Sequence, residues 1–447
     1  MLFPYFLDAL YALALCAFAP LVLWQYLRKG KARRGIWQRI CGPFRFKNTS
    51  MPQGAVWFHG VSVGEVHLLR TIVAEFKSRH PQLPIVVSAT TDTGLAEAEK
   101  FFGKDLVFRC PFDFSWAVAN AMDSLRPNMI VLAESELWPN FLTAAKARRI
   151  PVVVVNARVS PRSFARLRRV RSLVASWMRT ITCVAAQTGE YAHQYSKLGV
   201  PSERIRVTGS AKYDGVQSDR NNENTQTLRQ QLNIQETDIV WVAGSTSAPE
   251  EEIILRVYQK LEKENSRLRL IIVPRQSDRF EEVAEILVLS GESFVRRSRL
   301  PAIVPASSII LIDTIGELRA AWGLATVAFV GGSMDGQRGG QNMIEPAAYG
   351  AAVIFGVHTW NFRETVSRLI EAKAAIQVRS EAELEATLRQ LLQSPEVRET
   401  MGMAASHLVR TQQGATARTV DILGDVLERE AASRDSIGFL KQAAHHG

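Results

Sequence analysis

Short apolar runs alternate with longer stretches of helical pattern along most of this 447-residue chain. The runs fall into two sets, residues 56–58, 85–87, 106–108, 129–132, 152–155 and 183–185, and then residues 239–243, 268–273, 309–312, 327–330 and 353–355. Strands separated by helices form βαβ units, in which a parallel sheet carries helices on both faces. Because the chain is too long for one hydrophobic core, the pattern predicts two Rossmann-like domains, residues 31–218 and 226–425, and a helical tail at 426–447. The polar run 219–225 is expected to be a linker or the exposed start of a helix.

A glycine-rich segment, residues 331–346, directly follows the apolar run 327–330. Its glycines allow the backbone to approach a ligand closely and to adopt positive φ, and Pro346 suits the first position of a following helix. A strand, a glycine-rich turn and the amino end of a helix form an anion site, since unpaired N–H groups and the helix dipole point the same way. Such a turn can also be an ordinary connection. The prediction of an anion site therefore depends on the residues at the other strand ends.

Polar residues follow several strands of the first set, at the edge where ligands of such sheets bind. Glu65 falls in the first turn of the helix after the first strand. Glu134 and Glu136 come directly after the fourth strand, and Arg158 follows the fifth. A carboxylate in the first turn of a helix also stabilises the helix dipole, so Glu65 alone allows a purely structural role. Polar residues at three strand ends of one domain favour a functional site, and Lys212 lies in the segment that closes this half.

The strand ends of the second set carry residues suited to a phosphorylated ligand. Arg275 follows the second of these strands, where its guanidinium can bind a phosphate through two parallel hydrogen bonds. The third strand leads into the polar segment 313–317. Glu345, in the glycine-rich segment, can accept hydrogen bonds from the vicinal hydroxyls of a ribose. These residues predict that the second domain binds a nucleotide.

The first residues of the chain have the composition of a membrane anchor. Residues 2–24 are apolar apart from Asp8, and they match the roughly 20 residues with which a helix crosses a bilayer. Arginines and lysines follow at once, which places that side in the cytoplasm. A cleaved signal peptide would carry its charge before the apolar run instead. We expect an uncleaved anchor within residues 1–30 and the rest of the chain in the cytoplasm, with a shallow amphipathic insertion, which would suit Asp8 better, as the alternative.

The net charge of +10 and the pI of about 9.6 indicate an acidic partner: a membrane surface, a nucleic acid or a phosphorylated substrate. Much of the positive charge lies in residues 158–179, where arginines and apolar residues alternate at helical spacing. A solvated helix would show the same pattern, but near a membrane anchor it favours contact with anionic lipid. No motif combines basic with stacking aromatic residues, so we expect no nucleic-acid partner. The four cysteines form no CxxC pair, which argues against a disulfide framework or a structural zinc site.

Several segments, taken together and in order, resemble the bacterial Kdo (3-deoxy-D-manno-octulosonic acid) transferases of lipopolysaccharide assembly, which are GT-B glycosyltransferases. They are WFHGVSVGEV at 57–66, ESELWPN at 134–140, VTGSAKYD at 207–214, VPR at 273–275 and GGQNMIEPAAYGAAVIFGVHTWNF at 339–362. The resemblance spans the whole chain. It implies an α/β fold of the GT-B type, in which two Rossmann-like domains face a central cleft and an N-terminal helix anchors the protein to the membrane.

The resemblance also implies roles for individual residues. Glu65 matches the acidic residue taken as the general base on the acceptor hydroxyl, and Glu136, Glu134 and Lys212 match polar groups that assist the transition state. The segments that hold the CMP part of CMP-Kdo match Pro274, Arg275, Ile315, Gly316, Glu317, Asn342, Met343, Ile344 and Glu345. The family needs no metal for this step. We therefore expect no cofactor, with CMP-Kdo as the donor substrate.

Some positions depart from the usual pattern of the family. Gln276 stands where a histidine commonly follows the Pro-Arg pair, and Gln341 and Met343 stand where the family commonly has a histidine and then a proline around Asn342. Val357 replaces the proline of the FGPHT motif. The two glutamines keep hydrogen-bonding capacity but remove a titratable group each, so the affinity for the donor or its pH dependence is expected to differ.

The resemblance predicts an inverting transfer of Kdo from CMP-Kdo to a sugar hydroxyl of a lipid A precursor, lipid IVA, at the cytoplasmic face of the inner membrane. One alternative is another membrane-associated GT-B enzyme with a UDP- or GDP-sugar donor, which competition by CMP but not by UDP or GDP would exclude. A second alternative is a non-catalytic nucleotide-sugar-binding protein that keeps the fold. Binding of the nucleotide sugar without formation of product would indicate this non-catalytic alternative, and the intact Glu65, Lys212 and Arg275 weigh against it.

Overall fold

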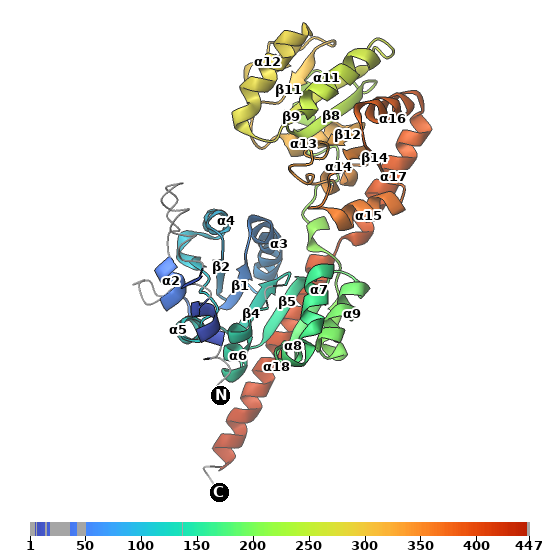
Figure 1. The fold of residues 1–447 in the computed structure, drawn as a ribbon. Helices are drawn as coiled ribbons and strands as arrows, with labels where there is room; N and C mark the ends of the chain where they lie inside the picture. The colour runs from blue at the N-terminus through green and yellow to red at the C-terminus, as the bar shows by residue number, and fades with distance from the viewer. Residues whose placement is uncertain are drawn as a thin grey trace. The chain divides into compact units, whose positions relative to one another are not determined.

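The computed structural model describes residues 5, 7–13, 16–17, 36–42, 51–135 and 137–444 (Figure 1). These residues form two compact units. The first unit contains the described residues up to Asp214 and those from Gln413 onwards, and the second unit is Gly215–Gln412. Each unit is built on one parallel sheet that is covered by helices, as the alternation of apolar runs predicts.

The first unit holds a 7-stranded parallel sheet of the order β3-β2-β1-β4-β5-β6-β7. The strands are β1 Val56–Gly60, β2 Ile85–Ala89, β3 Val107–Arg109, β4 Met129–Ala133, β5 Val152–Ala157, β6 Cys183–Ala186 and β7 Ile205–Val207. From β1 the chain proceeds to one edge of the sheet, and from β4 it proceeds to the other. In open α/β sheets, ligands bind beyond the carboxyl ends of the strands at such a reversal. Glu65 and Glu134 follow the two strands that meet there.

Alternate residues of these strands pack into two cores, one on each face of the sheet. Trp57 belongs to a core with residues of α5, α6, α8 and α9, whereas Phe58 belongs to a core with residues of α3, α4 and α18. The helices are α2 Ile36–Cys41, α3 Val63–Arg79, α4 Asp92–Phe102, α5 Ser115–Leu125, α6 Pro139–Ala147, α7 Pro161–Arg169, α8 Arg171–Met178, α9 Gly189–Leu198 and α18 Ala415–Ala444. The two faces explain why the strands read as continuous apolar runs.

The C-terminal helix α18 belongs to the first unit, although the chain has by then passed through the second. Val420 and Leu423 are fully buried in the core that contains Phe58, and Arg79 of α3 pairs with Asp421 at 2.6 Å. We expected the second domain to extend to residue 425 and the tail to begin at 426. The observed boundary falls at Gln413 instead, because the apolar face of α18 continues the core of the first sheet.

The second unit repeats the architecture with a 7-stranded parallel sheet of the order β10-β11-β9-β8-β12-β13-β14. The strands are β8 Ile239–Thr246, β9 Leu268–Pro274, β10 Phe294–Arg296, β11 Ile309–Leu311, β12 Val327–Val330, β13 Ala352–Gly356 and β14 Ala375–Val378. The order reverses between β8 and β12. Arg275 follows β9 and the glycine-rich segment follows β12, so both lie at the carboxyl ends next to this reversal.

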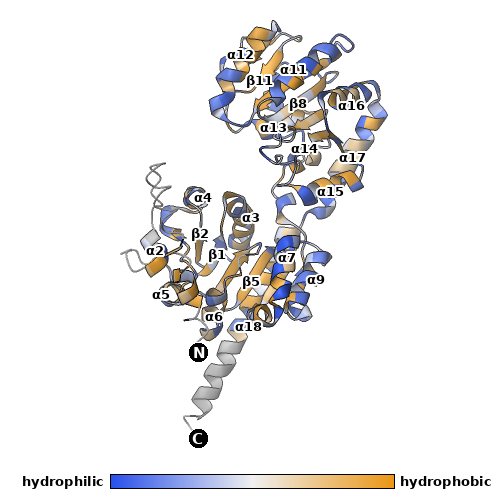
Figure 2. Cartoon of the chain, viewed as in Figure 1, coloured by the Kyte–Doolittle hydropathy of each residue, from blue (hydrophilic) through white to orange (hydrophobic). Residues whose placement is uncertain are grey.

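The helices of the second unit enclose this sheet. They are α10 Glu223–Gln231, α11 Glu250–Leu261, α12 Phe280–Ser290, α13 Leu318–Leu324, α14 Ile344–Ala348, α15 Arg363–Glu371, α16 Glu381–Gln393 and α17 Pro395–Gln412. The polar run 219–225 is the start of a helix, because Asn222 caps α10 by accepting from the N–H of Thr225 at 3.0 Å. Figure 2 shows apolar strands such as β5 and β8 beside helices with hydrophilic outer faces.

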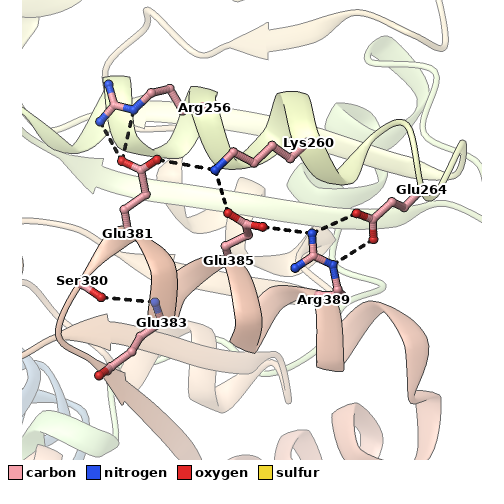
Figure 3. Close-up of polar contacts among 8 residues, drawn as sticks. All are labelled: Arg256, Lys260, Glu264, Ser380, Glu381, Glu383, Glu385 and Arg389. Atoms are coloured by element: carbon pink, nitrogen blue, oxygen red, sulfur yellow. Dashed lines mark hydrogen bonds and ion pairs between the residues drawn. The ribbon is translucent and has the colours of Figure 1, made fainter.

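Helices α11 and α16 are joined by ion pairs along their exposed sides (Figure 3). Arg256 and Lys260 of α11 pair with Glu381 and Glu385 of α16, each at 2.8 Å. Arg389 donates to both carboxylate oxygens of Glu264 at 2.9 Å. A single exposed pair contributes only about 0.2–1 kcal/mol, but several pairs in one network fix the position of α11 against its neighbour.

No helix in the described part of the chain is both long and apolar enough to cross a membrane. The expected anchor, within residues 1–30, falls largely outside the described residues. Of its described residues, Asp8 is buried and accepts hydrogen bonds from the N–H of Ser115 at 2.9 Å and from Nδ2 of Asn140 at 3.0 Å. The carboxylate that interrupts the apolar N-terminal run therefore caps α5 of the first unit.

Candidate active site

Glu65 lies in the first turn of α3, close to the end of β1. Its Oε2 accepts from the N–H of Val61 at 2.6 Å and its Oε1 from the hydroxyl of Ser62 at 3.2 Å. Ser62 is the N-cap and accepts from the N–H of Glu65 at 3.5 Å, so the two residues form a reciprocal cap of the helix. The structural role considered from the sequence is therefore present, and the two bonds also hold the carboxylate in one orientation.

The pKa of Glu65 is raised, chiefly because burial disfavours the charged carboxylate. The N–H of Val61 opposes this effect, the negative charge of Glu134 adds to it, and the positive charge of Arg158 reduces it. These interactions place Glu65 within electrostatic reach of the residues at the ends of β4 and β5. A carboxylate with a raised pKa is a stronger base than an ordinary glutamate, which suits general-base catalysis.

Glu134 is the centre of an ion-pair cluster at the end of β4. Arg158 donates to its Oε2 at 2.6 Å, and Nζ of Lys212 lies 3.2 Å from its Oε1. The phenol of Tyr195 donates to the backbone carbonyl of Glu134 at 3.1 Å. The backbone of Glu134 has a φ of 59°, in the left-handed region that non-glycine residues seldom adopt. The surrounding bonds hold this uncommon conformation, which is typical of functional sites.

Asn156 fixes the segment that carries Lys212. Its Oδ1 accepts from the N–H of Ala211 at 3.1 Å, and Gln187 donates to its backbone carbonyl at 2.8 Å. The sequence pattern gave no role to Asn156, and it placed Arg158 at a strand end without a role there. The sequence did contain a signal for Asn156, because this residue interrupts the otherwise apolar strand β5. Glu136, the remaining predicted catalytic residue, lies outside the described residues.

A cavity of about 510 Å³ lies at the carboxyl ends of the strands of the second unit. It brings together four of the predicted donor residues, Pro274 at the end of β9, Arg275 directly after it, and Ile315 and Gly316 before α13. Gln276 lines the same cavity, so one of the departures from the family pattern lies at this site. The side chain of Arg275 is exposed, and its backbone N–H donates to the backbone carbonyl of Thr246 at 3.0 Å. The arrangement offers an accessible guanidinium on a fixed backbone.

Glu317 faces a different cavity of about 530 Å³, together with Arg297, Arg319 and Tyr349. Its carboxylate accepts from Nε of Arg297 at 2.9 Å and from the hydroxyl of Thr314. The predicted group at 315–317 is therefore divided. Ile315 and Gly316 line both cavities, whereas Glu317 lines only the second and is held there by its ion pair with Arg297.

The residues at 342–345 have different environments. The amide of Asn342 donates to Glu345 at 3.3 Å and its oxygen accepts from the N–H of Ile344 at 3.1 Å. Burial raises the pKa of Glu345, while the charges of Arg319 and Arg275 act against this rise. The side chains of Met343 and Ile344 are buried, so any contact of these two residues with a ligand is limited to the backbone. Helix α14 begins at Ile344, two residues before the expected Pro346, and is only five residues long.

The start of the glycine-rich segment differs from the predicted anion site. The N–H of Gly332 donates to Oε2 of Glu250 at 2.7 Å, and the N–H groups of Ser333 and Met334 donate to its Oε1 at 2.9 and 3.1 Å. These N–H groups were expected to be available to a ligand, but they donate instead to a buried carboxylate of the protein itself. The role of Glu250 was not predicted from the sequence. Its only signal was the run of three glutamates at the start of α11.

The chain is similar to several known proteins. Residues 32–215 match the protein family described as 3-deoxy-D-manno-octulosonic-acid transferase (kdotransferase). The 3-deoxy-D-manno-octulosonic acid transferase of Haemophilus influenzae is 35% identical over 384 residues, which are 85% of this chain and 88% of that protein. The transferase of the same name from Bordetella pertussis is 32% identical over 445 residues, which are 93% of this chain and 99% of that protein. The chain belongs to this transferase family.

Kdo transferase family membership makes the chain a glycosyltransferase, as the resemblance implied. Among solved structures, Acinetobacter baumannii MurG is 13% identical and covers 84% of this chain and 100% of its own, with a TM-score of 0.53. A likeness at this identity concerns the fold alone. With the two parallel sheets, it confirms the GT-B class.

The recognised segments of this Kdo transferase contribute charged residues to a cluster in the first unit and to a cavity in the second. The first unit brings Glu65, Glu134 and Lys212 together with Arg158. The second unit brings Arg275 to a cavity and places Glu345 within its electrostatic reach. The first site holds charged groups at fixed positions, and the second has an exposed arginine beside a cavity.

Proposed function

We propose that this transferase moves Kdo from CMP-Kdo to a hydroxyl of a lipid A precursor, lipid IVA, with inversion at the anomeric carbon. In this step the acceptor oxygen bonds to the anomeric carbon of Kdo while the bond from that carbon to the CMP phosphate oxygen breaks. Glu65 takes the proton of the hydroxyl, and CMP leaves with the electron pair of the broken bond. The observation that carries the proposal is the position of Glu65, buried and oriented beside the Glu134 cluster at the reversal of the first sheet.

The surroundings of Glu65 support its role as the base. The helix cap orients both carboxylate oxygens, and burial raises the pKa so that the carboxylate accepts a proton more readily. Lys212 and Arg158 supply positive charge next to Glu134. We assign to Lys212 the stabilisation of negative charge that develops during transfer. The roles of Glu134 and Glu136 in assisting the transition state belong to the same proposal.

The donor is proposed to bind in the second unit. Arg275 would hold the phosphate of CMP through its guanidinium, with Pro274, Ile315 and Gly316 as the walls of the cavity. Glu345 would accept hydrogen bonds from the ribose hydroxyls. Glu317 would act beside the cavity through its bond to Arg297, and Asn342 would hold Glu345 and the start of α14. We expect the reaction to need no metal ion, which full activity in excess chelator would support.

The lipid acceptor requires access to a membrane, and the first unit carries a basic surface that suits one. None of the residues of α7 is buried, and the helix contains the exposed arginines Arg162, Arg166, Arg168 and Arg169 (Figure 2). Exposed Val170 and Leu173 stand beside them. Cationic and apolar side chains on one exposed surface favour the headgroup region of anionic lipid. We infer that this unit works at the cytoplasmic face of the inner membrane, with the N-terminal segment as an anchor.

The test is to incubate the protein with CMP-Kdo and tetraacylated lipid IVA and to weigh the lipid products. A mass gain of one or more Kdo units, inhibited by CMP but not by UDP or GDP, would support the proposal. Transfer from a UDP- or GDP-sugar in place of CMP-Kdo would overturn the choice of donor. Binding of CMP-Kdo without any product would overturn the catalytic assignment in favour of a sensor.

A further inference from the structure

Glu250, the first residue of α11, is fully buried and accepts four backbone hydrogen bonds. Three come from the glycine-rich segment after β12 and one comes from the N–H of Ser247 at 3.0 Å. Burial raises the pKa of this carboxyl, and the four N–H groups oppose the rise. The carboxylate thus occupies the position that a bound anion takes in other strand-to-loop sites. It satisfies amides that would otherwise be buried without a partner.

The hydrogen bonds from Gly332 and Ser333 to Glu250 also affect the position of Glu345, the predicted ribose contact. The N–H of Gly340 donates to the carbonyl of Gly332 at 2.7 Å, so these two parts of the glycine-rich segment lie against each other. Two residues after Gly340 the chain reaches Asn342, and Glu345 follows within α14. Glu250 therefore fixes the first part of the loop, and through Gly340 it fixes the part that carries Glu345.

Glu251, the next residue of α11, holds a segment that lines the cavity beside Arg275. It is 1% exposed and accepts from Nη2 of Arg279 at 3.0 Å. Arg279 closes the short 3-10 turn Ser277–Arg279, which follows directly on Arg275 and Gln276. The residues of this turn up to Asp278, and Phe280 beyond it, line the cavity. A buried ion pair that would be costly to break therefore fixes the segment that carries Arg275.

The two carboxylates diverge from one rigid element. Successive side chains on a helix point about 100° apart, which lets adjacent glutamates reach two different segments. The far side of α11 is tied to α16 by the ion pairs of Figure 3. The helix start is thus a common support for the glycine-rich segment and for the cavity-lining segment after β9.

We propose that Glu250 and Glu251 are positioning residues of the donor site, Glu250 for the glycine-rich segment and Glu251 for the segment that carries Arg275. The inference rests on the proposed function in taking the cavity beside Arg275 as the donor site. It assigns no contact with the substrate to either residue. It also implies that the phosphate of the donor binds to Arg275 and not to the amides of residues 332–334.

The helix start offers a matched control, because Glu252 is the third glutamate of the run and its side chain is 56% exposed. We would compare Glu250→Gln, Glu251→Gln and Glu252→Gln by hydrogen–deuterium exchange of peptides covering 331–340 and 274–280. Glu250→Gln should speed exchange in 331–340 alone, and Glu251→Gln in 274–280 alone. Both should raise the Kd for CMP on the order of 10- to 100-fold by misplacing donor contacts, and the KM for CMP-Kdo more than they lower kcat. Glu252→Gln should change neither segment nor affinity.

Equal loosening of both segments in either buried variant, or exchange and CMP affinity like those of the wild type, would overturn the proposal. If Glu250→Gln does not fold, Arg279→Met tests the Glu251 pair from the other side and should reproduce the pattern of Glu251→Gln. If the wild-type protein binds no CMP, the proposed function fails. The exchange pattern then still decides whether the glutamates hold these segments.

Discussion

Arg158 donates from Nε to Oε2 of Glu134 at 2.6 Å, and the two residues act on the proposed base Glu65 with opposite sign. The negative charge of Glu134 raises the pKa of Glu65, and the positive charge of Arg158 lowers it. The positive charge of Arg158 therefore offsets part of the rise in the pKa of Glu65, so that less of this buried base is in its protonated, inactive form. Three residues from the ends of three strands are coupled in this way.

Glu65→Gln should remove the base while keeping the size of the side chain. We expect transfer to fall on the order of 100- to 10,000-fold, the usual contribution of a general base. CMP affinity should not change, because the donor residues belong to the other unit. Turnover with CMP-Kdo and calorimetric binding of CMP measure the two quantities. Glu75→Gln, on the exposed side of the same helix, is the control, and wild-type turnover in a folded Glu65→Gln protein would contradict the assignment.

The rate of transfer should depend on pH through Glu65. The base works only when deprotonated, so the rate falls as the pH falls through its pKa. Because burial raises this pKa, the fall should begin at a higher pH than for an ordinary glutamate. A profile of kcat/KM against pH reports the pKa in the free enzyme. A rate that stays constant down to the pH at which exposed glutamates titrate would count against the environment described here.

Arg158→Met should shift that profile further. Without the guanidinium, the negative charge of Glu134 acts on Glu65 unopposed by Arg158, so the acid limb should move to higher pH. The variant should also lose about 1.5–3 kcal/mol of unfolding free energy, since the buried Glu134 carboxylate loses a charged hydrogen-bond donor. Urea unfolding and the pH profile measure these effects. Arg162→Met, on the exposed side of α7, should show neither.

Asp113→Asn should change how stability depends on pH. Burial raises the pKa of Asp113 to about 7, although the N–H groups of Asn140 and Phe141 act against this rise. Between about pH 4 and pH 7 the folded protein therefore keeps a proton that the unfolded chain has lost. The resulting stability is complete at the acid end and is lost as the pH rises through about 7.

The wild-type protein should thus lose stability relative to Asp113→Asn across this range, by up to about 1.4 kcal/mol per pH unit. Urea unfolding of both proteins at several pH values measures the difference, and the surface variant Asp105→Asn serves as the control. Parallel stability curves for the wild type and Asp113→Asn would show that Asp113 titrates normally.

Gly331→Ala should destabilise the second unit. A Cβ at this position would lie 2.6 Å from both the carbonyl oxygen of Ser245 and Cα of Thr246, and 2.8 Å from Oε2 of Glu250. Because backbone atoms cannot move aside cheaply, we expect a loss of about 1–3 kcal/mol. Gly189→Ala, where no atom lies within 4 Å of the added carbon, should stay within about 0.5 kcal/mol of the wild type in the same unfolding measurement. Equal effects of the two changes would contradict the close packing at Gly331.

The order of apolar runs was enough to predict two parallel sheets, because strands buried on both faces must be continuously apolar. It was also enough to place Glu65, Glu134, Arg158 and Arg275 at strand ends. The domain boundary at Gln413 was not predictable in this way. The helical pattern of α18 shows that it has an apolar face, but not which of the two cores that face covers.

The motifs of the chain determined its family and the residue types available for catalysis, because each motif consists of residues that are consecutive in the sequence. Only the tertiary structure decided which partners those residues have. It pairs Glu134 with Arg158 and Lys212, and it pairs Glu317 with Arg297. It also places the carboxylate of Glu250 where it accepts hydrogen bonds from the N–H groups of the glycine-rich segment. Each of these partners is distant in sequence, and hydrogen bonds between such residues depend on the packing of whole elements. A buried N–H group donates to whichever acceptor the fold places beside it, and here that acceptor is the carboxylate of Glu250.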